Sequence, residues 1–479
     1  MNKPLKRLAL KLLVGVCALL FVAGGCTPAA PDSGDSTDGN KPALTGDAAA
    51  FDGLKFEIDP DLDLGGKEMT VAVWGSVPGA GSTKYDRRYT LYDRTAAKYN
   101  VKIKWIASNM STFAQDYVLA YTSGDFYADV MFCPSYNGYD VAKLPGALVA
   151  LDDYIDYSNG RYKGIADTLM YVDGKHYSYM PNEMTANSLG YTVTYNTTIL
   201  QAHGCADPYE LYQQGKWDWD AFTEIVRQTT TIRDGVTTCY GVGGSNLLDA
   251  LLLSNGASVI QMNTKTNKFE CGLYSDAGNR TLQTLKTLIY DVKGVDPWYG
   301  NDNSILNFKD SKLAMIVGPQ YYGGNFITIG MPIMTVPLPK GPDIDHYVNG
   351  LQMAEWWVLP SISNFTPEQV LQVSFDAIRN DPEVEDTYIS PEDRRQDFII
   401  QTYDENSLNT EEEAGFFYDY ITSDEVETIL GITNNDIKSL MKQNVWVSLA
   451  EGEDPRTLLE RVKPVIDTAL INMLPDAYK

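Results

Sequence analysis

Residues 171–196 read YVDGKHYSYMPNEMTANSLGYTVTYN, and the rest of the chain is organised around them. Two short runs with the alternation of extended chain, residues 175–180 and 189–195, flank a polar insert that follows Pro181. Proline fixes φ and lacks a backbone N–H, so a β-ladder stops at Pro181. The stretch by itself fits either a crossing between two domains or a surface hairpin, and the flanking segments decide between them.

The segment before this stretch alternates strands with helices. A buried strand is predicted at residues 69–74, an alternating strand at 101–106 and a third strand at 128–133, with helices at residues 87–99 and 112–122 between them. This alternation indicates a parallel α/β sheet with right-handed crossovers. Ligands bind such sheets beyond the carboxyl ends of the strands, which are the loops at residues 75–82, 106–111 and 134–139.

A second α/β block follows the stretch. Asp218 is the predicted N-cap of a helix that opens within residues 217–222. Further helices are predicted at residues 247–254 and 277–292, and strands at residues 239–243, 314–317 and 333–339. The chain therefore has one α/β block on each side of residues 171–196.

The C-terminal third carries three local signals. Thr366-Pro367-Glu368-Gln369 is a capping-box helix start with proline in the first turn. Residues 381–413 are rich in Asp and Glu and are interpreted as solvated, irregular chain. Residues 455–473 form an amphipathic helix, which Pro464 is expected to kink or to split in two.

The N-terminus has the features of an export signal. Four cations precede an apolar run at residues 12–25, which is shorter than the roughly 20 residues of a membrane-spanning helix. The run closes on Ala23-Gly24-Gly25-Cys26, which resembles the lipobox of bacterial lipoproteins, although Ala23 stands where Leu is commoner. This resemblance implies a diacylglycerol on Cys26, and the alternative is an ordinary cleaved signal. Residues 27–50 are small and polar and predict a flexible tether outside the cytoplasm.

Length and charge narrow the function. With the first 50 of 479 residues set aside, the remainder is too long for one ordinary core, so two lobes are expected. The formal net charge is −25, and removal of the signal's four cations makes the mature protein more acidic still. Such a surface argues against nucleic acid and anionic lipid as partners, and makes an anionic ligand less favourable.

Cysteine and histidine give no sign of a cofactor or metal. Beyond the signal and Cys26, four cysteines remain without metal-type spacing: Cys133, Cys205, Cys239 and Cys271. Disulfides and buried thiols are both open for them. The three histidines, His176, His203 and His346, lack metal or triad spacing. The acidic run at residues 57–63 lacks the calcium-loop pattern, and a solvated run is favoured over a calcium site.

Six short motifs match one family in order. They are the lipobox at Cys26, TSGD at 122–125 running into ADV at 128–130, GKHY at 174–177 with Pro181 and Tyr195-Asn196, Trp217 with Trp219-Asp220 and Phe222, Phe308 with Lys312 and Ala314-Met315, and VPLP at 336–339 with Gly341. In this order the chain resembles the extracellular solute-binding lipoproteins of bacterial ABC importers, in particular the carbohydrate-binding group, family 1. The resemblance covers residues 69–360 and, more loosely, the C-terminal helices.

This resemblance implies an α/β fold of two periplasmic-binding-protein-like lobes joined by crossing strands. The first lobe is expected at residues 51–178 and 343–410, and the second at residues 179–342 and 411–479. Residues 171–196 then become the first crossing between lobes. The implied function is a monomeric carbohydrate receptor without catalysis, held at the extracytoplasmic membrane face by its N-terminal lipid alone, that delivers substrate to ABC permease subunits. The alternatives are a receptor for a peptide or other small solute, and a secreted polysaccharide-processing enzyme whose carboxylate pair has no sequence signature.

The expected site must suit a neutral sugar. Aromatic rings stack on the sugar's apolar face, while amides and carboxylates bind its hydroxyls and give selectivity. Relatives place a stacking aromatic after the strand that ends at Gly318-Pro319, and Glu183 lies just past the crossing. Of Trp356 and Trp357, one is expected in the core. The candidate ligand-binding residues are Glu183, Tyr321, Tyr322, Gln320, Ser135, Tyr136, Trp74, Trp298 and Trp356.

Overall fold

The computed structural model describes most of the chain beyond the tether. The described residues are 51, 53–74, 95–109, 112–142, 144–158, 170–172, 174–179, 190–263, 265–266, 268–297, 303–351, 354–379, 395–396, 398–399, 402–403, 408–423, 425–432 and 435–474. All of them belong to the compact unit Thr45–Lys479.

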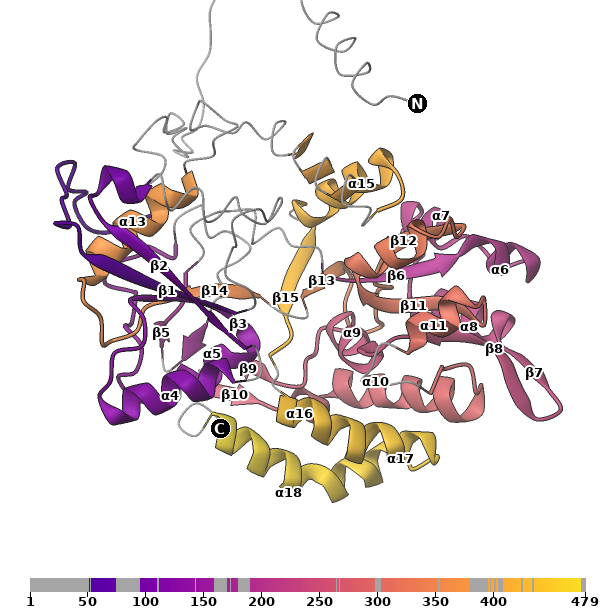
Figure 1. Cartoon of the computed structure of the whole chain (residues 1–479). Coiled ribbons are helices and arrows are strands. Elements are labelled where there is room, and N and C mark those ends of the chain that lie inside the picture. The colour runs from indigo at the N-terminus through magenta and orange to yellow at the C-terminus, as the bar shows by residue number, and fades with distance from the viewer. Residues whose placement is uncertain are drawn as a thin grey trace, which may run out of the picture. The chain divides into compact units, whose positions relative to one another are not determined.

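The first sheet has four strands in the order β14-β3-β1-β2 (Figure 1). β1 (Glu68–Trp74) pairs in parallel with β2 (Lys102–Ser108) and β3 (Val130–Pro134), and β14 (Glu355–Val358) joins β3 antiparallel. Helix α4 (Phe113–Ser123) connects β2 to β3. The predicted parallel strands are confirmed within two residues. The loop predicted at residues 134–139 is wrong, because helix α5 (Ser135–Ala142) begins directly after β3.

Asp129 explains why an acidic residue stands at the entrance of β3. Its carboxylate is buried and accepts hydrogen bonds from the Thr70 N–H at 2.7 Å, the Asn364 N–H at 2.8 Å and the Ser363 hydroxyl at 2.9 Å. These bonds join β1 to the entry of helix α13 (Pro367–Arg379). A buried carboxylate is tolerated where several donors satisfy it, so Asp129 has a structural role.

The second sheet is mixed and has the order β12-β6-β11-β8-β7. Its strands are β6 (Tyr191–Asn196), β7 (Thr231–Arg233), β8 (Val236–Gly243), β11 (Leu313–Pro319) and β12 (Ile333–Pro337). The helices of this block are α6 (Thr197–Ala202), α7 (Pro208–Gln213), α8 (Trp219–Thr229), α9 (Leu247–Leu253), α10 (Asp276–Lys286), α11 (Ser304–Lys309) and α12 (Gly324–Ile327). A hairpin of β9 (Gln261–Asn263) and β10 (Lys268–Glu270) precedes α10, which continues into a π-helical turn, Thr287–Asp291.

The WDWD segment at residues 217–220 fixes α8 against the second sheet. Trp217 is fully buried and its indole N–H donates to the Pro337 carbonyl at 2.8 Å, while the indole N–H of Trp219 donates to the Ser254 hydroxyl at 3.1 Å. Asp218 accepts from the Ala221 N–H at 3.0 Å, which confirms the predicted N-cap. The motif is therefore structural in this chain.

The chain passes between the two sheets more than once. Residues 175–180 do not form one strand: β5 (Lys175–His176) pairs with β4 (Tyr171–Val172), and Tyr179 then bridges to Trp357 of β14. β6 of the second sheet begins at Tyr191. The chain later returns through β13 (Tyr347–Leu351) to β14, and β13 pairs in parallel with β15 (Val426–Leu430).

Asn349 joins the segments between the sheets. Its buried side chain accepts a hydrogen bond from the Gly190 N–H at 2.8 Å and donates to the Thr428 hydroxyl at 3.4 Å. A Cβ on Gly190 would overlap the Gly350 carbonyl, so this close approach requires glycine. One amide thus connects the start of β6 with β13 and β15.

Helices capped by Thr flank the acidic region. The predicted capping box is confirmed, since the Thr366 N–H donates to Gln369 Oε1 at 3.1 Å and the Gln369 N–H to Thr366 Oγ1 at 3.3 Å. The prediction of irregular chain through residue 413 is wrong at its end, where α15 (Glu411–Ile421) begins after the N-cap Thr410. Glu413 is buried and accepts from the Thr335 N–H of edge strand β12 at 2.8 Å and the Asn409 N–H at 2.7 Å.

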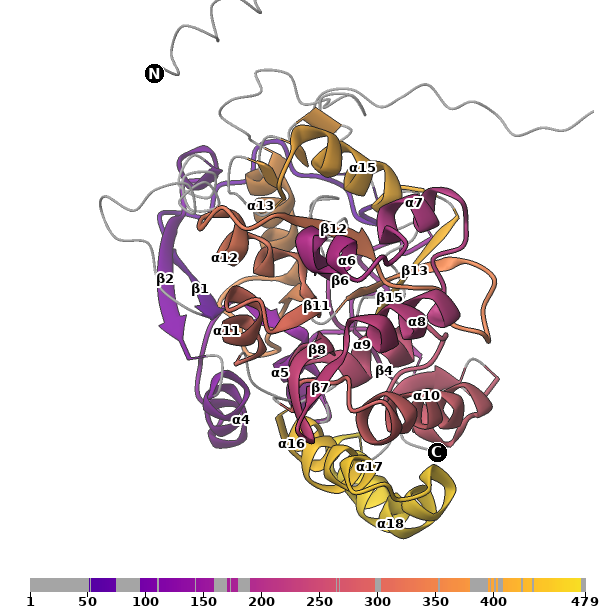
Figure 2. The same ribbon diagram turned by 90° about the vertical axis from the view of Figure 1, so that its right-hand side faces the viewer.

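The C-terminal helices pack against α10. They are α16 (Asn435–Leu440), a π-helical turn at Met441–Trp446, α17 (Val447–Ala450) and α18 (Pro455–Met473) (Figure 2). α18 runs as one helix through Pro464, and its predicted apolar face is buried. The four cysteines left open by the sequence are free thiols. Among the described residues, no helix is long and apolar enough to cross a membrane.

Candidate functional site

The parallel strands of the first sheet end on Trp74, Ser108 and Pro134. Trp74 and Ser108 are register partners, so the ends of β1 and β2 lie side by side. Trp74 is half-buried, and its indole N–H is enclosed without a hydrogen-bond partner among the described residues. Leaving such a donor unpaired costs about 1–3 kcal/mol, which a bound acceptor would recover.

Ser135, predicted to bind ligand, is used by the fold. Its backbone N–H donates to the Ala354 carbonyl at 2.8 Å, and its hydroxyl accepts from the Ala354 N–H at 3.1 Å. The residue is buried, and this pair of bonds closes the entry of β14 onto the end of β3. Tyr136 follows in α5, and its side chain lies outside the part of the chain that the structure describes.

Gln320 and Tyr322 follow β11 in a short 3-10 turn at the carboxyl end of the second sheet. Tyr322 is buried, and its hydroxyl lies 3.1 Å from the Ser245 hydroxyl, which follows the parallel strand β8. Asn246 donates to the same Ser245 oxygen at 3.0 Å. Gln320 is half-buried, and its Oε1 is enclosed without a partner among the described residues.

Ser245 and Asn246 were not predicted from the sequence. The signal available was the run Gly243-Gly244-Ser245-Asn246, which directly follows a strand, because loops at the carboxyl ends of neighbouring parallel strands lie close together. The structure thus brings Gln320, Tyr322, Ser245 and Asn246 to one edge of the second sheet.

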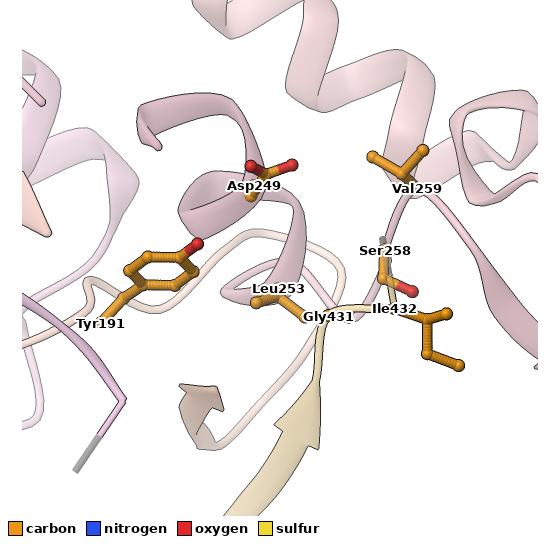
Figure 3. A pocket seen from close by; sticks show the side chains of 7 residues that line it. All are labelled: Tyr191, Asp249, Leu253, Ser258, Val259, Gly431 and Ile432. Carbon is orange, nitrogen blue, oxygen red and sulfur yellow. The ribbon is translucent and has the colours of Figure 1, made fainter. Parts of the chain in front are cut away.

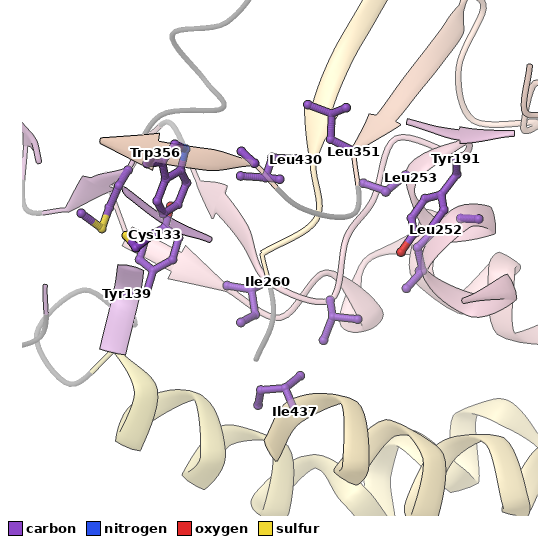
Figure 4. Close-up of a cluster of buried hydrophobic side chains, with 14 of the residues drawn as sticks. Cys133, Tyr139, Tyr191, Leu252, Leu253, Ile260, Leu351, Trp356, Leu430 and Ile437 are labelled. Carbon is purple, nitrogen blue, oxygen red and sulfur yellow. The ribbon is translucent and has the colours of Figure 1, made fainter. Parts of the chain in front are cut away.

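Trp356 and Trp357 are both buried, although only one was expected in the core. Figure 4 shows Trp356 beside Tyr139 of α5. The two rings pack edge-on, with their centroids 5.6 Å apart. Its indole presents no exposed surface to a ligand in this structure. Glu183 and Trp298 lie outside the described residues, as does the side chain of Tyr321.

A small pocket lies where β6 and β15 meet α9. Figure 3 shows Tyr191 and Asp249 on one side and Ser258, Val259 and Ile432 on the other. Burial raises the pKa of Asp249 to about 6, and the nearby Lys438 opposes this rise. The cavity measures about 10 Å³, close to the room that a single water molecule needs. It cannot hold a sugar ring.

The sequence identifies the family. A family model described as bacterial extracellular solute-binding protein matches residues 90–376, more than half of the chain. The chain belongs to this family. The predicted resemblance to bacterial extracellular solute-binding proteins is thereby confirmed, and the family's extracellular character agrees with the expected location outside the cytoplasm. Comparison with curated protein sequences finds no match.

Solved structures show the fold of this solute-binding protein. A cyclo/maltodextrin-binding protein complexed with maltotetraose is similar at 14% identity and a TM-score of 0.58, covering 87% of this chain and 99% of its own. The Arthrobacter globiformis cyclic α-maltosyl-1,6-maltose-binding protein is similar at 14% identity and a TM-score of 0.56, covering 85% of this chain and 99% of its own. The Listeria monocytogenes ABC substrate-binding protein in complex with cycloalternan is similar at 14% identity and a TM-score of 0.54, covering 84% of this chain and 99% of its own. The predicted two-lobed, periplasmic-binding-protein-like α/β fold is confirmed.

The family and the similar structures are binding proteins rather than enzymes. Within the described ranges, no group of three His, Cys, Asp or Glu side chains is arranged to hold a metal ion. The described part of this solute-binding protein therefore contributes hydrogen-bonding and aromatic groups at its strand ends. These groups suit the reversible binding of a polar solute.

Proposed function

We propose that this solute-binding protein captures a sugar or oligosaccharide between its two lobes and delivers it, without catalysis, to the transmembrane subunits of an ABC permease. The observation that carries the proposal is the pair of unpartnered polar atoms at the strand ends, Trp74 Nε1 and Gln320 Oε1. Trp74 ends β1 of the first sheet, and Gln320 directly follows β11 of the second sheet. Similar folds in proteins solved in complex with maltotetraose and with cycloalternan support the choice of a sugar.

The chemistry of the two strand ends suits a neutral sugar. The Trp74 ring offers a flat face for the sugar's C–H surface, and its N–H is a donor for a hydroxyl. Gln320 offers an acceptor for a hydroxyl. A ligand without the hydroxyl would leave these groups buried and unpaired, which gives selectivity. We include Tyr321, Tyr136, Trp298 and Glu183 in the proposed site because each follows a strand end, a crossing or a loop of the second lobe.

We assign the lobes as residues 51–178 with 343–410, and 179–342 with 411–479. The segments tied together by Asn349 then form the hinge. A ligand that contacts both lobes stabilises the closed form more than the open form, so binding shifts the population towards closure. Asn349 keeps the segments in register while the lobes move.

We assign Cys26 as the lipid attachment site and residues 27–50 as the tether to the extracytoplasmic face of the cell membrane, with the protein a monomer. Mass spectrometry of the protein from membranes tests this assignment. A diacylglyceryl modification on Cys26 is expected, and an unmodified N-terminus elsewhere would contradict it.

A thermal-shift screen with mono- and oligosaccharides tests the proposed function. A ligand at about 100 times its Kd adds about 2.7 kcal/mol to the free energy of unfolding, which is readily seen as a rise in Tm. We expect a shift with at least one sugar and unchanged sugar after prolonged incubation. A shift with peptides and none with sugars would favour the peptide receptor, and sugar turnover would favour an enzyme.

Variants locate the site. Trp74→Ala and Tyr321→Ala should weaken the sugar's affinity, whereas Phe126→Ala, which removes an exposed aromatic ring from the first lobe, should not. Equal affinities in all three variants would contradict the proposed site while leaving the sugar assignment intact.

A further inference from the structure

The structure has an open groove of about 950 Å³. Helices α7 and α15 and the starts of β13 and β15 form it, and its described lining includes none of the residues proposed for sugar binding. Its size is within the range of small-molecule sites. Aromatic side chains line its wall, and carboxylates line its rim.

Four aromatic rings form the wall. Tyr212 lies at its centre, with ring centroids 4.7 Å from Tyr347, 5.2 Å from Phe416 and 6.2 Å from Tyr420. Tyr420 is buried, and its hydroxyl has no hydrogen-bond partner among the described residues, whereas the other three rings keep part of their surface exposed. Burial raises the pKa values of Tyr212 and Tyr347 to about 12, so these hydroxyls remain neutral.

The rim is acidic. Its carboxylates are Asp345, Asp419, Glu425 and Glu427. Arg395 binds Asp419 through two N–H groups at 2.8 and 3.0 Å, and the Lys340 ammonium lies 5.5 Å from the centroid of the Tyr347 ring. Glu425 has no salt bridge within the described residues. The carboxylates and rings of the groove thus already contact Arg395 and Lys340 of the same chain, and the Glu425 carboxylate remains available to a bound cation.

His346 is a cation built into this rim. Nδ1 lies 3.0 Å from an Asp345 oxygen and Nε2 lies 2.9 Å from a Glu427 oxygen. Both carboxylates can only accept when ionised, so both ring nitrogens donate and the imidazole carries a positive charge. Its hydrogen bonds to Asp345 and Glu427 raise the pKa of His346, in agreement with this geometry.

We propose that the groove is a second binding site, selective for a small organic cation whose ammonium group meets the Tyr212, Tyr347 and Phe416 rings and the Glu425 carboxylate. Ring faces attract cations through their quadrupole, and a nearby carboxylate adds a direct charge. The acidic rim repels anions. An amino sugar and a quaternary ammonium compound share the required chemistry.

Protonation of His346 sets the strength of the site. The imidazolium neutralises part of the charge of Asp345 and Glu427, and the raised pKa values of Tyr212 and Tyr347 keep these two tyrosines neutral. When His346 loses its proton, the rim becomes more negative by one charge. The groove therefore binds an organic cation more tightly as pH rises through the His346 titration.

Titration calorimetry of the full protein with tetramethylammonium tests the proposal, with a glucosamine disaccharide and its N-acetylated, neutral counterpart as further probes. Glu425→Gln should weaken tetramethylammonium binding about three- to fivefold, as expected for one partly exposed charge. Glu460→Gln, which makes the same change on the exposed face of α18, should leave it unchanged. Tyr212→Leu should also weaken it.

The pH dependence of tetramethylammonium affinity distinguishes binding in this groove from non-specific attraction to the acidic protein surface. Affinity for tetramethylammonium should rise between about pH 5.5 and pH 8.5, and His346→Gln should abolish the rise. Equal effects of Glu425→Gln and Glu460→Gln on tetramethylammonium binding, or an equal effect of Glu425→Gln on the binding of the glucosamine and N-acetylglucosamine disaccharides, would overturn the assignment. These results leave the proposed sugar site untouched, because tetramethylammonium is not a sugar and Glu425 is not among the residues proposed for sugar binding.

Discussion

Two buried carboxylates inside the lobes differ from two side chains at the strand ends. Asp129 and Glu413 have every carboxylate oxygen bonded to backbone or hydroxyl donors. Trp74 Nε1 and Gln320 Oε1 are each buried without a hydrogen-bond partner among the described residues. Buried polar groups are nearly always satisfied in native proteins, so an unpaired one at the carboxyl end of a strand in each sheet marks a place for a ligand. The comparison separates residues that hold the fold from residues available to bind.

The largest expected effect comes from Asp129. Asp129→Ala leaves the Thr70 and Asn364 N–H groups and the Ser363 hydroxyl without their acceptor, so we expect a loss of about 3 kcal/mol or more in the free energy of unfolding. Urea denaturation measures it. Asp125→Ala removes an exposed carboxylate from the same motif and should change stability by less than about 0.5 kcal/mol. Equal losses in the two variants would break the comparison.

The next effect comes from Glu413. Glu413→Gln replaces one acceptor oxygen by an NH₂ group that faces a backbone N–H, either of Thr335 or of Asn409. We expect a loss of about 2 kcal/mol, with α15 released from edge strand β12. Hydrogen exchange at Thr335 reports the release. Glu411→Gln, on the exposed first turn of the same helix, is the matched control and should leave that amide protected.

The sequence predicted those elements whose signals are local. The alternating strand–helix pattern predicted the three parallel strands of the first sheet, and the Asp218 cap and the Thr366–Gln369 box each need only neighbouring residues. α15 has the same kind of signal, since Thr410 and Glu413 stand at capping-box spacing. The many acidic residues around Thr410 and Glu413 instead favour the prediction of irregular, solvated chain, which hides this capping-box signal.

Elements held by distant contacts could not be predicted in the same way. α5 contains Gly138, a poor helix former, and a Cβ there would overlap the Trp356 ring, more than 200 residues away. The bridge from Tyr179 to Trp357 and the bonds of Asn349 depend on chain that the local pattern does not contain. The same holds for the site. The sequence places Ser135 and Trp356 next to strand ends, but it does not show which of their surfaces the fold covers.

A smaller effect is expected where carboxylates are exposed. His346 has a raised pKa, so the unfolded chain loses this proton at lower pH than the folded protein. The stabilisation is therefore complete below the unfolded pKa of about 6.5 and is lost as pH rises through the folded value. Because the group is partly exposed, we expect less than about 1 kcal/mol. The Tm difference between the protein and His346→Gln should shrink between about pH 5.5 and pH 9, and a difference independent of pH would contradict the imidazolium.

The smallest effect on stability and the clearest effect on binding should meet at Gln320. Its Oε1 is enclosed without a partner, so Gln320→Leu removes no described hydrogen bond of that atom and relieves a desolvated acceptor. Replacing an unpaired polar group by an apolar one of similar size is close to neutral or slightly stabilising. The same variant should lose about 1 kcal/mol or more of sugar affinity, since a ligand hydroxyl would then lack its acceptor. Unfolding and sugar titration of one variant therefore decide whether an orphaned strand-end group belongs to the ligand: a stability loss like that of Glu413→Gln with unchanged affinity would assign Gln320 to the fold instead.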